Sequence, residues 1–251
     1  MALALLILGA LVWVITAGPD GSSAAPRVTS LQEKKAVRLE EQLAKEPDNE
    51  KLLLQTMMAW IRAGADRLEK INTDTQPIPS TVPEDYKAGL QTWNEYLKQT
   101  DGEANRKIAE TAGVTYFQLV EIGSTSPGEA TANAAGAVKA QQIVCEHDPI
   151  LYTLSELAIY QYFNGEYAAG DRAAKAAAAD KSGLGELEPK DVIGQLNEYK
   201  ERGEKFVARV KRGFETLEET GEEELETPIK GYGSAAGLNG YEPGEGPGDR
   251  S

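Results

Sequence analysis

The sequence predicts an all-α protein whose helices pair into hairpins. The clearest observation is the segment 149–181, where two helical runs flank a turn at Gly165. The first run carries large apolar residues and the second is mostly alanine, so the second helix can lie close against the first. A second observation is the low aromatic content of 7%, which favours helix packing over a β-sandwich. One such hairpin cannot bury both of its apolar faces, so neighbouring segments should supply further hairpins.

Length and charge limit the classes of protein that the chain can represent. A chain of 251 residues allows one or two domains with a sizeable core. The formal charge is −14 and no basic patch is interleaved with aromatic residues, so nucleic acid is not an expected partner. The one cysteine, Cys145, excludes an intramolecular disulfide and leaves the redox compartment undetermined.

The chain begins with an uncharged apolar run at residues 2–17. As a helix this run spans about 24 Å, against about 30 Å for the core of a bilayer. We predict a hydrophobic membrane anchor at residues 1–18 and a flexible linker at residues 19–27. A signal peptide is an alternative, although no basic residue precedes the run and Pro26 follows the small residues that could be cleaved. A buried core helix is a second alternative, although the run is apolar all round.

Helical periodicity then opens a predicted helical domain at residues 28–219. The opening helix places Leu31 on its apolar stripe and ends at the turn Pro47–Asp48. The next helix carries an apolar run at residues 52–61. Gly64 follows that run, at the place where a hairpin turn would use a glycine.

Residues 65–82 interrupt this pattern. Prolines within the segment break a helical backbone, so we predict an inserted loop. Helix resumes at Pro83, and further helices are expected at residues 103–122 and 129–146, the last of them rich in small residues. Together with the segment 149–181, these runs make three hairpins after the opening helix.

The C-terminal part divides into a helix and a tail. Pro189 begins a long helix that is expected to run to about Leu217, with apolar residues along one face. Such a helix is suited to cover the last apolar surface of a stack of hairpins. Residues 220–251 are acidic and then Gly-rich, which predicts a disordered acidic tail.

No sequence pattern points to catalysis or to metal binding. Cys145 and His147 are two residues apart, so they do not share a helical face, and a metal would need two further ligands. Residues 180–191 superficially match a calcium-binding loop, but Leu184 offers no oxygen ligand and Asp191 replaces the preferred glutamate. Nucleotide-binding, nucleophile-elbow and zinc-protease motifs are absent from the sequence. We therefore expect no enzyme activity, no cofactor and no metal site.

Eight positions of the hairpin at 149–181 match a known repeat pattern: Leu154, Leu157, Ala158, Gly165, Tyr167, Gly170, Ala174 and Ala177. The hairpin resembles a tetratricopeptide (TPR) repeat. The family prefers alanine where Gly170 stands and a large residue where Ala174 stands, so the repeats would be degenerate. Residues 39–64 resemble the opening repeat of membrane-anchored bacterial TPR proteins, including those of cytochrome c biogenesis. The resemblance implies a TPR-like helical-hairpin solenoid with a long C-terminal capping helix.

The resemblance also implies a function. In TPR arrays the first helix of each hairpin lines a concave groove that holds a peptide or a partner helix. The chain is therefore expected to be a protein–protein interaction scaffold, with Tyr152, Ser155 and Tyr162 as candidate partner-binding residues. Tyrosine suits such a surface because it can bury a ring and still donate a hydrogen bond. The alternative is an assembly or chaperone factor for an exported or membrane complex, similar to the TPR proteins of cytochrome c biogenesis.

Two considerations point to different orientations of the predicted single-pass protein in the cell membrane. Four basic residues follow the apolar run and none precedes it, which by the positive-inside rule places the helical domain in the cytoplasm. Bacterial anchored TPR proteins commonly carry the domain outside, so the resemblance implies an extracytoplasmic domain. The four basic residues are Arg27, Lys34, Lys35 and Arg38.

Overall fold

The structure, a computed structural model, describes residues 30–71, 76–180 and 188–214. Within these ranges the chain forms eight helices and no strand, which confirms the all-α prediction. None of these helices combines the length and the apolar character that a membrane crossing requires. The predicted anchor, linker and tail lie outside the described residues. The helices are α2 (Leu31–Leu43), α3 (Glu50–Glu69), α4 (Thr81–Gln99), α5 (Arg106–Ile122), α6 (Pro127–His147), α7 (Leu151–Phe163), α8 (Tyr167–Ala179) and α10 (Pro189–Lys211).

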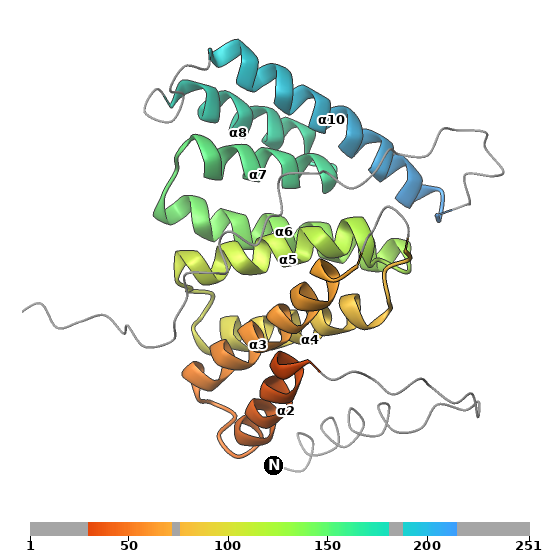
Figure 1. Ribbon diagram of the computed structural model, residues 1–251. Coiled ribbons are helices and arrows are strands. Elements are labelled where there is room, and N and C mark those ends of the chain that lie inside the picture. Colours follow the sequence, from red (N-terminus) through yellow and green to blue (C-terminus); the bar gives the residue numbers. More distant parts are fainter. Residues whose placement is uncertain (1–29, 72–75, 181–187, 215–251) are drawn as a thin grey trace, which may run out of the picture.

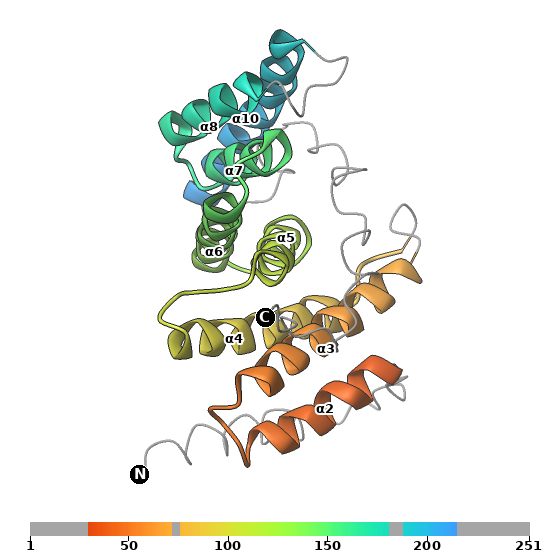
Figure 2. The ribbon, with the colours of Figure 1, turned by 90° about the vertical axis from the view of Figure 1, so that its left-hand side faces the viewer.

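Consecutive helices pair and the pairs stack in chain order (Figure 1). Helix α3 packs on α4, α5 on α6, and α7 on α8, while α2 lies against α3 at one end. Figure 2 shows the same order from the side, with α10 beside α7 and α8 at the other end. A single apolar cluster runs from α3 to α10. The predicted opening helix, three hairpins and terminal helix are therefore all present.

Two helix boundaries differ from the sequence prediction. Helix α3 continues through Gly64 to Glu69, and α4 begins at Thr81, so the connection is shorter than the predicted loop at 65–82. Helix α10 begins at Pro189 as predicted but ends at Lys211 instead of near Leu217. The chain leaves the helix there because the two residues after its C-cap have positive φ, a conformation that terminates helices. These residues are Gly213, at φ 83°, and Phe214, at φ 57°.

In each hairpin a glycine of one helix lies against a tyrosine ring of the other. A Cβ atom built on any of these three glycines would lie within 2.6 Å of a ring carbon, closer than real Cβ contacts come. The two helices therefore approach more closely than any side chain at that position would allow. Gly64 has this role and does not form the turn that the sequence suggested. The pairs are Gly64 with Tyr86, Gly136 with Tyr116, and Gly170 with Tyr162.

Replacing Gly136 with alanine tests this close approach. The added methyl group would push against the Tyr116 ring, so we expect a loss of about 1–3 kcal/mol in the free energy of unfolding. Gly128 is the matched control, because it lies in the same helix and its Cβ position meets nothing within 4 Å. Gly128→Ala should be neutral or gain up to about 1 kcal/mol. Chemical denaturation of both variants measures the difference, and equal stabilities would contradict the packing described.

A buried ionic contact joins the first three helices. Arg67 of α3 pairs with Glu33 of α2, and its Nε lies 3.1 Å from Oδ2 of Asp85 on α4. Both carboxylates are buried, so the guanidinium compensates two negative charges at the junction. This contact explains why α2 turns Glu33 inward, while Leu31, predicted on its apolar stripe, is 80% exposed.

The Arg67 contact can be tested by removing its charge. Arg67→Met keeps much of the side-chain volume but leaves two buried carboxylates uncompensated, so we expect a loss of about 3 kcal/mol or more. Arg172 on α8 is exposed, so Arg172→Met should change stability by no more than about 0.5 kcal/mol. Denaturant midpoints of the two variants provide the comparison. A small effect of Arg67→Met would mean that the ion pair does not hold α2 in place.

Candidate interaction surface at the start of helix α7

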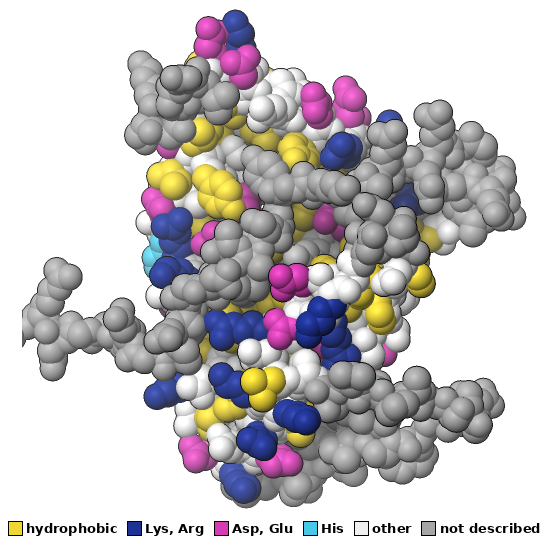
Figure 3. All heavy atoms as spheres, in the orientation of Figure 1, with side chains coloured by type: hydrophobic (Ala, Val, Ile, Leu, Met, Phe, Trp, Pro, Cys, Tyr) yellow, Lys and Arg dark blue, Asp and Glu magenta, His cyan; other side chains and the backbone are white. Residues whose placement is uncertain are grey.

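Large apolar side chains reach the surface at two places in the described residues. Leu31 and Val37 are exposed on α2, and Ile150 and Tyr152 are exposed at the start of α7. Figure 3 shows hydrophobic side chains at the surface close to His147 (cyan), where α6 leads into α7. Isolated exposed apolar residues are common, but two that are nearly adjacent on a helix that carries predicted site residues mark a candidate contact surface.

The three predicted partner-binding residues are placed differently. Tyr152 is 44% exposed and Ser155, nearly one turn later, is partly exposed. Tyr162 is only 1% exposed, so it does not meet the expectation of a residue on an accessible surface. Its ring packs over Gly170, and its hydroxyl donates a hydrogen bond to Oδ1 of Asp171 at 3.1 Å. Because Gly170 has no side chain, the Tyr162 ring packs against the backbone of α8. This packing explains why Tyr162 is buried while Tyr152 is exposed.

Hydrogen bonds fix the first turn of α7 and hence the position of Tyr152. The Ile150 amide donates to Oγ1 of Thr153 at 3.1 Å, and that hydroxyl donates to the Asp148 carbonyl at 2.6 Å. The Leu151 amide donates to Oδ2 of Asp180 at 2.7 Å. The helix start is therefore capped by side chains from within the turn and from the end of α8.

Two carboxylates of segment 180–191, which superficially matches a calcium-binding loop, accept hydrogen bonds at helix starts. Asp180 caps α7, and Oδ2 of Asp191 accepts a hydrogen bond from the Glu188 amide at 3.2 Å, at the start of α10. Residues 181–187 lie outside the described residues. Both ends of the segment thus serve helix termini, where carboxylates are favoured.

A buried polar group lies beneath Tyr152. Glu156 is 2% exposed and receives hydrogen bonds from the side chains of Tyr152 and Gln141, while its Oε2 has no hydrogen-bond partner. Gln141 of α6 is fully buried, and its Nε2 donates to the Thr153 carbonyl at 2.9 Å. Its Oε1 also has no hydrogen-bond partner. Two acceptors are thus buried without donors, which is rare and costly in protein interiors.

The environment of Glu156 changes its acidity. Burial is the main cause and raises the pKa of the carboxyl from 4.5 to about 7, and the nearby carboxylate of Glu110 on α5 raises it further. The hydrogen bonds from Tyr152 and Gln141 act in the opposite direction. The carboxyl therefore changes protonation near neutral pH.

Glu156→Gln should remove a pH-dependent loss of stability. Because the pKa in the fold lies above 4.5, the folded chain keeps a proton that the unfolded chain releases as the pH rises from 4.5 to about 7. The parent should thus lose about 3 kcal/mol across this interval, while the variant should not. The variant should match the parent near pH 4.5 and exceed it at pH 8. Denaturation at both values measures this, and a difference independent of pH would contradict the burial of the carboxyl.

Cys145 and His147 do not form a joint site. The Cys145 thiol donates to the Thr153 carbonyl at 3.3 Å, and burial raises its pKa to about 11, so it is a poor nucleophile at neutral pH. Nε2 of His147 lies 3.0 Å from the Ala104 carbonyl oxygen, which ties the end of α6 to the connection before α5. Across the described ranges, no group of three or more potential ligands could hold a metal ion.

Comparison with known proteins returns no match to a family model, to a curated protein or to a solved structure. The resemblance to TPR repeats therefore stays a prediction from the residues quoted above. Sequence reasoning did not identify Glu156 or Gln141. The available signal was weak: both are polar residues on the buried side of a helix, at spacings where apolar residues are expected.

Proposed function

We propose that this chain is a membrane-anchored, TPR-like solenoid that works as a protein–protein interaction scaffold. It holds a peptide or a partner protein on the surface around Ile150, Tyr152 and Ser155. The observation that carries the proposal is the exposure of Ile150 and Tyr152 on a rigidly capped first turn, next to a buried polar group. Such a combination of an aromatic anchor and convergent polar groups is typical of contact surfaces.

The stack of hairpins supports the same proposal. Helix pairs joined in chain order present a long surface built from successive helices, which repeat proteins use to bind extended partners. The apolar run at residues 2–17 would tether this surface to a membrane. The acidic charge of the chain makes a protein partner more suitable than nucleic acid.

The proposal can be tested with a displayed library of random octapeptides, selected against the full chain in detergent micelles. Tyr152→Ala should lower the affinity for the selected peptides about tenfold, because aromatic anchors commonly contribute more than about 1 kcal/mol to an interface. Leu31→Ala on α2 is the control, since Leu31 is the more exposed apolar residue but lies on another surface. Fluorescence anisotropy measures the affinities, and thermal melting checks that both variants fold.

Removal of residues 218–251 provides the opposing test. A Gly-rich acidic segment has little apolar area to bury, so its removal should leave peptide binding unchanged. Binding that is lost with this segment and retained in Tyr152→Ala would place the contact site at the C-terminus. A scaffold surface on α7 would then be wrong.

A further inference from the structure

We propose that the junction of α5, α6 and α7 is a binding site for one cationic side chain, a lysine or an arginine, of the partner segment. Glu156 and Gln141 would accept hydrogen bonds from the cation, and Tyr152 would lie over it. The inference rests on the proposed scaffold function and specifies the chemistry of its partner.

The unsatisfied groups of this junction are hydrogen-bond acceptors. Oε2 of Glu156 and Oε1 of Gln141 have no hydrogen-bond donor. The orientation of the Gln141 amide is set by its Nε2, which donates to the Thr153 carbonyl, so the oxygen must point elsewhere. The oxygen lies 3.6 Å from the position that a Cβ of Gly113 on α5 would occupy. Both oxygens thus offer lone pairs at the meeting point of three helices.

Carboxylates surround this junction. Within the described ranges Glu156 has no cationic partner, whereas each buried carboxylate near Arg67 has one. Burial chiefly raises the pKa of Tyr160, and the charges of Glu156, Glu121 and Glu110 add to the effect. Carboxylates from α5 and α7 therefore act on one buried ring. A cation would compensate this negative potential, while an anionic ligand would increase it.

Tyr152 connects this junction with the surface of the protein. Tyr152 is nearly half-exposed while its hydroxyl donates a hydrogen bond to the buried Glu156, so this side chain joins the carboxyl to the surface. Displacement of this hydroxyl by an ammonium or guanidinium group would exchange a neutral donor for a charged one, and charge-assisted hydrogen bonds are stronger. An aromatic ring beside the cation is also favourable. A metal ion fits less well, because the described residues hold no suitable cluster of ligands.

The test uses peptides selected from the octapeptide library on the full chain in micelles at pH 8. The selected sequences should share a lysine or an arginine, and its replacement by norleucine or citrulline should weaken binding about tenfold or more. Glu156→Gln should lower the affinity for the parent peptide to a similar degree. In this variant the parent peptide and the substituted peptide should bind with equal affinity. This double-mutant cycle places the cation next to Glu156.

Glu146→Gln is the matched control for this cycle. Glu146 lies exposed on the neighbouring helix α6, so its neutralisation removes one charge without altering the buried junction. We expect less than about a twofold change in affinity, because exposed charges are screened by salt. Melting curves verify folding of both variants.

Binding should also depend on pH. The carboxyl must be ionised to hold a cation and its pKa is about 7, so affinity should fall about tenfold from pH 8 to pH 6 in the parent. The titratable groups that interact with Glu156 are Glu110 of α5, Cys145 of α6, and Tyr152 and Tyr160 of α7. On the α8 and α10 side, Asp171 and Lys200 pair with each other beside Tyr162. The fall should disappear in Glu156→Gln, which lacks the ionisable carboxyl.

Three results would overturn the inference. Selected peptides that lack a cationic residue would exclude it. An equal effect of norleucine in the parent and in Glu156→Gln would place the cation elsewhere, and would leave the scaffold function intact. Selection of no peptide at all would remove the scaffold function together with this site.

Discussion

The close approach of the two helices within each hairpin is the constraint on which this stack depends. Glycine on one helix and a tyrosine ring on the other set the distance three times, with Gly64, Gly136 and Gly170 as the small partners. The ring fills the space that the glycine leaves, so the two helices bury apolar area at this contact. The position of the glycine varies, since it lies on the first helix of one hairpin and on the second helix of the other two.

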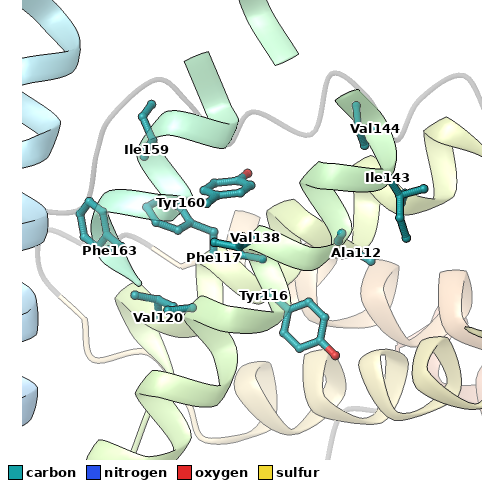
Figure 4. Packing of buried hydrophobic residues seen from close by; sticks show 14 of the residues in the cluster. Ala112, Tyr116, Phe117, Val120, Val138, Ile143, Val144, Ile159, Tyr160 and Phe163 are labelled. Carbon is teal, nitrogen blue, oxygen red and sulfur yellow. The ribbon is translucent and has the colours of Figure 1, made fainter. Parts of the chain in front are cut away.

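Aromatic contacts extend this packing between hairpins. Phe117 of α5 lies 4.8 Å from Tyr160 and 5.0 Å from Phe163 of α7, measured between ring centroids, and Figure 4 shows these side chains together. Phe163 in turn lies 5.5 Å from Phe206 of α10. Rings at these separations contribute more than their buried area alone. The terminal helix is thus joined to the middle of the stack through one chain of aromatic residues.

The polar junction beside this aromatic chain contains a buried carboxylate that has no cationic partner among the described residues. The buried carboxylates of Glu33 and Asp85 pair with Arg67, and the Tyr116 hydroxyl donates to Oδ1 of Asn94 at 3.1 Å, although the Tyr86 hydroxyl has no hydrogen-bond partner. Glu156 and Gln141 instead keep unsatisfied oxygens. Sites where local rules are broken inside an otherwise consistent fold are commonly functional. The proposed cation site would account for this departure, and it lies directly under the exposed Tyr152.

The sequence by itself determined the helical class, the pairing of helices and the position of most turns. Apolar periodicity and the contrast between large and alanine-rich runs are local properties, so 149–181 was predicted as the hairpin of α7 and α8, and Pro189 as a helix start. The tertiary structure alone decided which contacts particular residues make. Gly64 became a contact point instead of a turn, and Tyr162 became buried because Gly170 left room for its ring. The burial of the Glu156 carboxyl depends on how the three successive helices α5, α6 and α7 pack together, and the pattern within one helix does not encode that packing.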